Sequence, residues 1–212
     1  MNSVALEIKK RFLKEYKNAK SELIFNNHYE LIVCVILSAQ CLDSRVNIIT
    51  PALFKAYPTI NDLANAKLIN VKELIKSCNF YQNKALNLIK MAKSVMQDHD
   101  GIIPMDFDAL INLSGVGEKT ANVVLCEGIG ANVMAVDTHI FRVSKRLNLS
   151  NAKTPNDCAK ELSNIFKTDL DKLHKGMVLF GRYICKAKKP NCNQCFLNDL
   201  CNEFKEQKSL IN

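Results

Sequence analysis

Four cysteines near the C-terminal end of the chain are spaced so that they could bind one inorganic centre. They are Cys185, Cys192, Cys195 and Cys201, and they stand within a basic segment. Structural zinc sites usually show two tight cysteine pairs, whereas only Cys192 and Cys195 form such a pair here. The wider outer spacing favours a [4Fe–4S] cluster, because its larger core spreads its ligands. A zinc site and unligated core cysteines are the alternatives, while nine cysteines in 212 residues are too few for a disulfide scaffold.

Residues 113–122, LSGVGEKTAN, could bind a phosphate. Two glycines around Val116 permit a tight reversal, and a helix is expected to begin directly after it. The N–H groups of the hairpin and of the helix N-terminus would then point outward together, and the helix dipole favours an anion there. Such a helix–hairpin–helix grips a DNA backbone phosphate without reading a base. An ordinary helical hairpin is the alternative, and the segment lacks the first glycine and preceding strand of a nucleotide P-loop. The candidate contacts are Gly115, Val116, Gly117 and Thr120.

Lys119 and Asp137 are candidates for chemistry next to this hairpin. Lys119 falls in the first turn of the expected helix, where the positive end of the dipole is expected to lower the pKa of the amine and favour a nucleophile. A point-charge contact with phosphate explains Lys119 equally well. Asp137 stands where an apolar stretch ends and a helix begins, so its default role is an N-cap, which also keeps a carboxylate ionised and oriented. His139 follows in the first helical turn, where a structural role is more common than catalysis.

The composition favours a polyanionic partner. Twenty-nine Lys and Arg against 21 Asp and Glu give a net charge of +8 and a pI of about 9.0, which favours nucleic acid although charge alone does not decide. The amphipathic N-terminal segment does not read as a signal peptide. The most apolar segment, residues 31–39, is too short to span a membrane. Isolated cysteines without an export signal predict a reducing cytoplasm.

Helical periodicity runs through the whole chain and predicts an all-α fold. Residues 133–136 are the one brief strand candidate, and the residues after Glu203 are expected to form a frayed polar tail. We expect N-caps at Asp43, Asn61, Asp137, Asn156 and Asp169. The expected helices cover residues 3–17, 28–40, 43–57, 81–98, 105–112, 118–130, 137–147, 155–166 and 169–184.

The expected helix at residues 28–40 is apolar around most of its circumference, which is typical of the buried centre of a helical bundle. Gln40 emerges at its end as an uncharged polar residue. A helix end that reaches solvent explains Gln40, and its position alone assigns no function.

With these features in view, the chain resembles the endonuclease III family of base-excision DNA glycosylases over about residues 20–203. The motifs occur in the family's order and separation, and together they are very specific. The resemblance rests on LSAQ at 37–40 with Asp43, the hairpin and helix at 113–125, VDTHIFRV at 136–143, the segment 174–185 and the spacing of the four cysteines.

The resemblance implies a two-lobed helix–hairpin–helix fold with double-stranded DNA in the cleft between the lobes. A six-helix barrel would comprise residues 21–131, and residues 1–20 with 132–212 would form the lobe that holds the [4Fe–4S] cluster. It also implies that Lys119 is the nucleophile and that Asp137 is its essential carboxylate partner.

The same resemblance implies how DNA is held. Gln40 would fill the space left by a flipped nucleotide, and if the loop of Phe80 wedges the duplex, its aromatic ring could intercalate. The basic loop within the cysteine motif would touch the DNA backbone through Lys186, Lys188 and Lys189.

The implied activity is that of a bifunctional glycosylase and abasic-site lyase, which acts as a monomer in the bacterial cytoplasm on DNA with oxidised pyrimidines or abasic sites. Ser114, Leu42 and Phe80 depart from the common family pattern, which affects strand wedging and lesion preference and leaves the catalytic pair intact. A monofunctional adenine glycosylase is the nearest rival, and Lys119 opposes it. A non-catalytic iron–sulfur DNA-binding protein is a rival from another class, and it has no use for Lys119 with Asp137.

Overall fold

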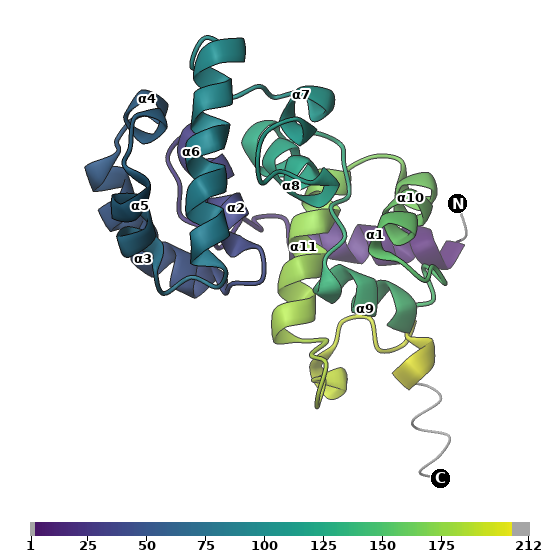
Figure 1. The fold of residues 1–212 in the computed structure, drawn as a ribbon. Helices are drawn as coiled ribbons and strands as arrows, with labels where there is room; N and C mark the ends of the chain where they lie inside the picture. The colour runs from purple at the N-terminus through teal and green to yellow at the C-terminus, as the bar shows by residue number, and fades with distance from the viewer. Residues whose placement is uncertain (1–2, 205–212) are drawn as a thin grey trace. The chain divides into compact units, whose positions relative to one another are not determined.

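The computed structural model describes residues 3–204, and that part of the chain contains helices and no strand (Figure 1). The all-α prediction is therefore confirmed, and the strand candidate at residues 133–136 forms no strand. Most of the expected polar tail, residues 205–212, lies outside the described residues. None of the described helices is both long and apolar enough to cross a membrane.

The chain divides into two compact units. Ser21–Gly130 form the first, here called the central unit, and the described residues before and after it form the second, the terminal unit. The central unit contains α2 (His28–Ser38), α3 (Asp43–Ala56), α4 (Ile60–Ala64), α5 (Leu68–Ile75), α6 (Tyr81–Asp98), α7 (Phe107–Ile111) and α8 (Glu118–Ile129). The terminal unit contains α1 (Ser3–Glu15), α9 (Thr138–Arg146), α10 (Pro155–Phe166), α11 (Leu170–Tyr183) and the 3₁₀ helix η1 (Cys192–Gln194). The terminal unit is thus assembled from the two ends of the chain.

Helix α2 is buried within the central unit, as its apolar circumference predicts. Each side chain from Leu31 to Leu37 is at most 4% exposed, and the helix packs against α3, α6 and α8. Asn27 begins α2 by accepting a hydrogen bond from the N–H of Glu30 at 2.9 Å. The helix ends at Ser38, earlier than expected, so Gln40 lies in the turn that follows.

Two short helices, α4 and α5, were missed by the sequence analysis. Thr59 begins α4 through a capping box, in which its hydroxyl accepts from the N–H of Asp62 while the Asp62 carboxylate accepts from the N–H of Thr59. The expected cap Asn61 is therefore wrong, because the threonine two positions earlier binds the free N–H first. Both helices pack on α6.

Of the other expected caps, Asp137 and Asp169 stand at N-cap positions, and Asp43 and Asn156 do not. Asp137 caps α9, whereas Thr154 caps α10 in place of Asn156. Asp43 is the first residue of α3 and not its cap. Asp169 occupies the N-cap position of α11 without a capping hydrogen bond, because its carboxylate pairs with lysines and its backbone is left-handed, with φ 59°.

A cluster of phenylalanines forms the centre of the terminal unit. Phe12 of α1 meets Phe180 of α11 edge to face at 5.3 Å between ring centroids, and it meets Phe196 in the same way at 5.4 Å. Phe12 and Phe180 are each 1% exposed, and a ring buried to this extent contributes about 1.5–3 kcal/mol through removal of apolar surface from water. Phe196 is partly buried against them. Lys9 of α1 adds a polar anchor, since its amine donates to the carbonyl oxygens of Phe166 and Thr168 at 3.3 and 2.7 Å.

Candidate active site and metal centre

The hairpin before α8 combines two buried apolar side chains with an exposed tip. The side chains of Leu113 and Val116 are 4% and 6% exposed, whereas Gly115 and Gly117 are exposed. The N–H of Val116 donates to the carbonyl oxygen of Leu113 at 3.1 Å, which closes the turn. The buried side chain of Val116 anchors the hairpin, and its expected contact with DNA stays a prediction.

The two glycines of the hairpin serve different purposes. Gly115 has φ +83°, and an added Cβ would lie 3.0 Å from Cβ of Asn87, so both its backbone and its surroundings require glycine. Gly117 is the N-cap of α8 with φ −97°, which any residue adopts, and an added Cβ would meet nothing within 4 Å. The open space over Gly117, at a helix N-terminus whose first N–H groups have no intrahelical partner, leaves room for a phosphate to approach the backbone.

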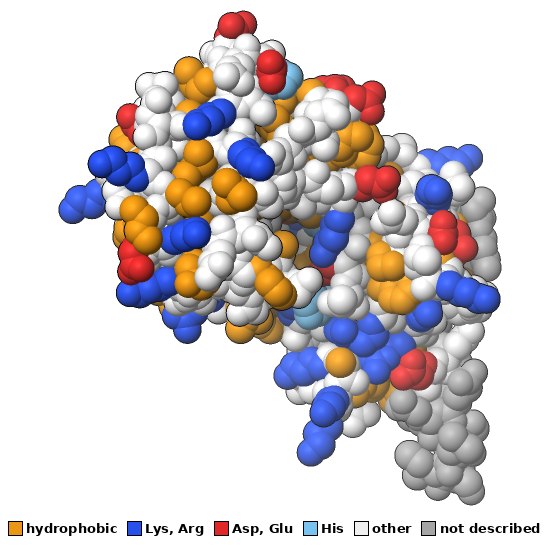
Figure 2. Space-filling view, viewed as in Figure 1, with side chains coloured by type: hydrophobic (Ala, Val, Ile, Leu, Met, Phe, Trp, Pro, Cys, Tyr) orange, Lys and Arg blue, Asp and Glu red, His pale blue; other side chains and the backbone are white. Residues whose placement is uncertain are grey.

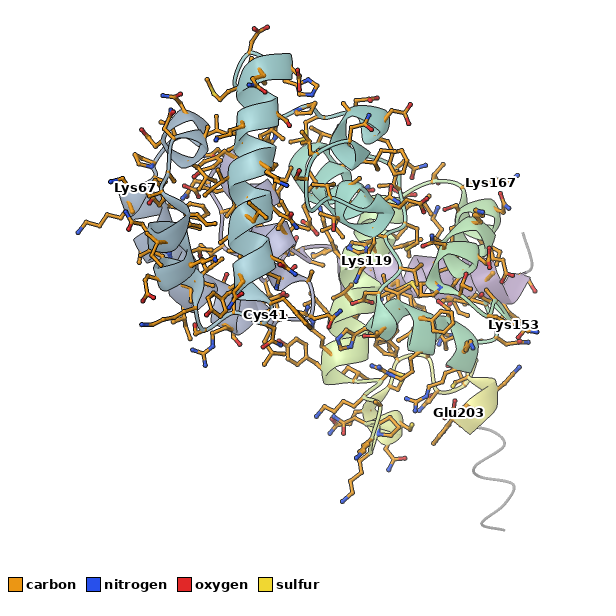
Figure 3. All side chains as sticks on the ribbon, viewed as in Figure 1. Cys41, Lys67, Lys119, Lys153, Lys167 and Glu203 are labelled. Atoms are coloured by element: carbon orange, nitrogen blue, oxygen red, sulfur yellow. The ribbon has the colours of Figure 1, made fainter. Side chains whose placement is uncertain are left out.

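Lys119 is the second residue of α8, and its side chain is exposed (Figure 3). The amine therefore stands one helical turn or less from the hairpin tip, within the central unit. An exposed amine at this place can act as a nucleophile toward a bound sugar or can pair with a phosphate, so the geometry is compatible with both interpretations of the sequence.

Asp137 belongs to the terminal unit, where it is half-buried. Its Oδ1 accepts a hydrogen bond from the N–H of Ile140 at 2.7 Å, and this bond fixes the orientation of the carboxylate. His139 packs against α11, because its Cβ would lie 2.8 Å from a Cβ added at Gly181. One ring nitrogen of His139 lies 3.3 Å from the guanidinium of Arg142, so the structural role expected for His139 fits its surroundings.

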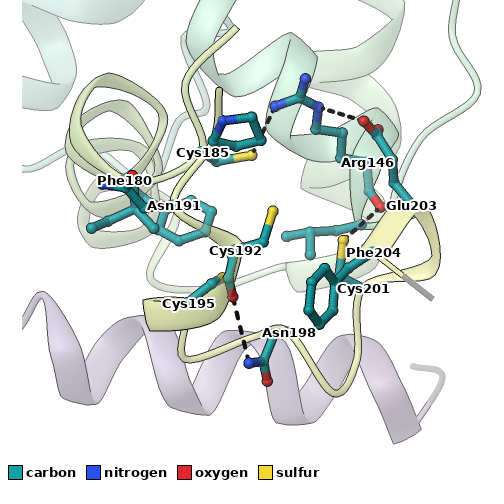
Figure 4. Close-up of a pocket in the computed structure, with 13 residues that line it drawn as sticks. Arg146, Phe180, Cys185, Asn191, Cys192, Cys195, Asn198, Cys201, Glu203 and Phe204 are labelled. Carbon is teal, nitrogen blue, oxygen red and sulfur yellow. Dashed lines mark hydrogen bonds and ion pairs between the residues drawn. The ribbon is translucent and has the colours of Figure 1, made fainter. Parts of the chain in front are cut away.

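The four cysteines of the C-terminal segment line one pocket (Figure 4). The sulfur atoms of Cys185, Cys192 and Cys201 point toward the same space in Figure 4, and Cys195 completes the lining. The pocket encloses about 440 Å³, part of it open to solvent. The sequence brings these thiols together through a short loop and the 3₁₀ turn at η1, which shapes the CxxC pair.

The protonation chemistry of these thiols fits a metal centre. Burial, with a smaller contribution from the charges of the neighbouring cysteines, raises the pKa of Cys195 to about 11. Burial also raises the pKa of Cys192 and of Cys201, and the charges of neighbouring cysteines act in the same direction. Ionised thiols crowded into one pocket require a compensating cation, and iron bound by thiolates supplies that charge.

Two arginines of α9 hold the cysteine loop, and the sequence analysis missed them. Arg142 donates to the carbonyl oxygen of Cys185 at 3.1 Å. Arg146 donates to Sγ of Cys185 at 3.4 Å and to the carbonyl oxygen of Lys186 at 2.7 Å. It also pairs with Glu203 at 3.2 Å. Arg142 and Arg146 are four positions apart and therefore lie on one face of α9. This spacing is the sequence feature from which their shared role could have been predicted.

The loop after Cys185 presents exposed positive charge. Lys186, Lys188 and Lys189 are all exposed, and Figure 2 shows Lys and Arg side chains gathered over this part of the terminal unit. A basic patch of this kind is typical of a surface that binds a polyanion. Because Arg146 fixes the carbonyl oxygens of Lys186 and Ala187, the charges stand on an ordered loop.

Gln40 and Phe80 lie at the tips of two exposed turns of the central unit. Both have left-handed backbones, with φ 54° and 57° respectively, and Phe80 is 63% exposed. The side chain of Asn79 donates to the carbonyl oxygen of Gln40 at 2.7 Å, so the two turns are in contact. This contact was not predicted from the sequence, since α3, α4 and α5 separate the two turns along the chain.

Comparisons with known families match both regions of the chain that carry the candidate chemistry. Residues 33–168 match the family described as HhH-GPD superfamily base excision DNA repair protein. Residues 185–201 match the iron–sulfur binding domain of endonuclease III. The second match begins and ends at cysteines of the pocket, so this part of the chain is a [4Fe–4S] cluster-binding domain and not a zinc site.

Individual relatives are similar over almost the whole chain. The endonuclease III of Rickettsia conorii is 43% identical over 91% of this chain and 92% of its own length. That of Bacillus subtilis is 40% identical over 92% of this chain and 91% of its own. A solved structure of a trapped endonuclease III–DNA covalent intermediate matches with a TM-score of 0.90 and 38% identity, over 96% of this chain and 98% of that one.

Proposed function

Because this chain belongs to the endonuclease III family of base excision DNA repair proteins, we propose that it is a DNA glycosylase and abasic-site lyase that acts on oxidised pyrimidines through a Schiff base on Lys119. The observation that carries the proposal is the exposed amine of Lys119 in the first turn of α8, directly after a hairpin suited to a DNA phosphate. The relative that was trapped as a covalent complex with DNA supports a covalent step.

In the proposed complex the duplex is held mainly by its phosphates. The N–H groups around Gly115, Gly117 and Thr120 bind one phosphate at the N-terminus of α8. Lys186, Lys188 and Lys189 add charge contacts that carry no sequence information.

The damaged nucleotide is flipped out because its C1′ cannot be reached inside the base stack. Gln40 then occupies the vacated space, and the exposed ring of Phe80 wedges between neighbouring bases. Both side chains are suited to this role because they stand at the tips of exposed turns.

The chemistry requires a neutral amine at Lys119. Its lone pair attacks C1′, and the glycosidic bond breaks so that the base leaves with the bonding electrons and takes up a proton. Ring opening leaves a protonated Schiff base between Nζ and C1′. Loss of a proton from C2′ and departure of the 3′ oxygen with the C3′–O electron pair form a C2′=C3′ double bond and cut the strand. Hydrolysis of the Schiff base then releases Lys119.

Asp137 is the proposed carboxylate partner in this reaction. A fixed negative charge stabilises the positive charge that develops on the sugar, and it can assist proton transfer. The capping bond to Ile140 holds the carboxylate in one orientation. The cluster, whose proposed ligands are Cys185, Cys192, Cys195 and Cys201, cross-links the loop that carries the basic residues and takes no part in bond breaking.

Borohydride trapping on a duplex with a single abasic site tests the proposal. The wild-type protein should form an abundant covalent adduct, and Lys119→Gln should form none while it still binds DNA. Lys90→Gln is the matched control, because Lys90 is an exposed lysine on α6. A Lys119→Gln variant that cuts abasic DNA at the wild-type rate contradicts the proposal, and base release by the wild type without an adduct indicates a monofunctional glycosylase. Duplexes that each carry one oxidised pyrimidine then define the substrate.

A further inference from the structure

Lys84 is a buried lysine in the first turn of α6, and the proposed reaction does not use it. It is 6% exposed, and its amine donates to the carbonyl oxygens of Leu37 and Ala39, each at 2.7 Å. Its third contact is Sγ of Cys78 at 3.2 Å. An ammonium group has three donors, so these three acceptors occupy all of them.

The acceptors of Lys84 lie where two separate turns meet. The carbonyl oxygens of Leu37 and Ala39 belong to the C-terminal end of α2, where the helix dipole favours a cation, and Ala39 directly precedes Gln40. Cys78 belongs to the turn that precedes Phe80, and its thiol donates to the carbonyl oxygen of Leu37 at 3.3 Å. Lys84 therefore ties the end of α2 to the turn before α6.

A second link joins the same two turns closer to their tips. The side chain of Asn79 donates to the carbonyl oxygen of Gln40 at 2.7 Å. Cys41, labelled in Figure 3, also lies at this junction, since its side chain interacts with that of Cys78. The turns are thus connected from the buried amine of Lys84 outward to the exposed backbone at Gln40.

The conformation that these contacts hold is an unfavourable one. Gln40 and Phe80 both have left-handed backbones, with φ 54° and 57°, and neither is a glycine. Glutamine and especially phenylalanine adopt this region rarely, so the surrounding contacts must impose it. Both side chains are exposed, so the strain brings no burial of apolar surface. The strained backbone instead fixes the direction in which the side chains of Gln40 and Phe80 project from the surface.

We propose that Lys84 is a positioning residue, which locks the Gln40 turn and the Phe80 turn into one rigid two-pronged element that enters the duplex when a nucleotide is flipped. The inference rests on the proposed function, because it assigns DNA insertion to the two tips. Lys84 is not a second nucleophile, since all its donors are occupied and its amine is buried. Its replacement should therefore impair flipping and leave the capacity of Lys119 to form a Schiff base.

The test uses Lys84→Met, which keeps the apolar stem and removes the donors, and Asn79→Ala, which removes the outer link from an exposed residue. Lys90→Met is the matched control, because it removes an exposed lysine from the same helix. The probe is a duplex in which 2-aminopurine stands opposite a tetrahydrofuran abasic analogue, so that its fluorescence reports the unstacking caused by insertion. Strand cleavage of a duplex with thymine glycol is measured under single-turnover conditions.

We expect Lys84→Met to lose most of the fluorescence rise and to cleave about ten- to a hundred-fold more slowly at saturating protein, which is the scale of a misplacement of about 1 Å. Asn79→Ala should change both readouts in the same direction by a smaller factor, and Lys90→Met should match the wild type. In a Gln40→Ala, Phe80→Ala background, Lys84→Met should add no further loss, because the element it positions has been removed. A purely structural role would lower the melting temperature and would add its loss in both backgrounds.

Three outcomes overturn the inference. They are a wild-type fluorescence rise in Lys84→Met, an undiminished effect of Lys84→Met in the double-alanine background, and, where Lys84→Met fails to fold, a wild-type response of Asn79→Ala. Borohydride trapping of the wild-type protein on abasic DNA separates this failure from failure of the proposed function. If the wild-type protein forms a covalent adduct with abasic DNA, the proposed reaction occurs. The fluorescence results then test the role of Lys84 alone.

Discussion

The hairpin glycines allow a paired prediction, because Gly115 and Gly117 face different constraints. Gly115→Ala places a Cβ 3.0 Å from Cβ of Asn87 on a backbone with φ +83°, and the left-handed conformation alone costs an alanine about 1–2 kcal/mol. In a chain of this size that loss lowers the melting temperature by about 2–8 °C. Gly117→Ala has open space and an ordinary φ of −97°, so it should change stability by no more than about 0.5 kcal/mol.

Gly115→Ala should have the larger effect on stability, whereas Gly117→Ala should weaken DNA binding without a comparable loss of stability. A methyl group at Gly117 occupies the space through which a phosphate reaches the N-terminus of α8, and loss of a hydrogen bond to a charged group costs about 1.5–3 kcal/mol, or roughly ten-fold or more in Kd. Thermal unfolding and fluorescence anisotropy on an undamaged duplex measure the two quantities. If Gly117→Ala binds DNA as tightly as the wild type, the phosphate does not sit over this glycine and the role given to the hairpin is refuted. If Gly115→Ala is as stable as the wild type, the steric account of that glycine fails.

Other predictions test the metal centre, the basic loop and the anchor of α1. The purified protein should be brown and contain about four irons per chain, and Cys192→Ser should abolish both; stoichiometric zinc without iron after anaerobic preparation would contradict the cluster. Replacing Lys188 and Lys189 by alanine should reduce the slope of log K against log salt by up to about 2, with little effect on trapping at saturating DNA; loss of lesion preference at full salt slope would show that the loop reads damage instead. Lys9, followed by Lys172, lowers the pKa of Asp169 to about 2, below its value in the unfolded chain, so this contribution to stability is present above about pH 4 and disappears as the pH falls toward 2. In Lys9→Met the free energy of unfolding should therefore decrease less between about pH 4 and 2 than in the wild type. If urea titrations give the same pH dependence for both proteins, the proposed contribution of the Lys9–Asp169 pair is refuted.

The helices that the sequence predicts best are those with long apolar periodicity. Helix α2 was expected because it is apolar on nearly all sides, and α6 was expected with both bounds as observed. The short helices α4 and α5 were missed because five to eight residues give too little periodicity. Caps were misplaced where two capping residues stand two positions apart, as with Thr59 and Asn61, since either can bind the free N–H groups.

The candidate site was predictable where its residues are close in sequence. The cysteine loop and the hairpin before α8 are local motifs, so their spacing is enough to propose their chemistry. Arg146, Lys84 and Lys9 were not singled out, because each acts on groups brought near only by tertiary packing. Lys9 and its acceptor at Phe166, for example, are 157 residues apart. A lysine or arginine in a helical pattern gives no sign of whether it faces solvent or a buried carbonyl oxygen.

The anchoring of α1 by residues from the far end of the chain has a consequence for biosynthesis. The central unit is continuous in sequence, so all residues of its core have been synthesised once Gly130 has been added. Helix α1 is made before the central unit, yet the partners of Phe12 and Lys9 are made after it, in α10, α11 and the segment of Phe196. Contacts between residues so distant in the chain form slowly. The apolar face of α1 in the nascent protein therefore stays uncovered until these segments have been made, and a stall before α11 leaves that face open to chaperones and proteases.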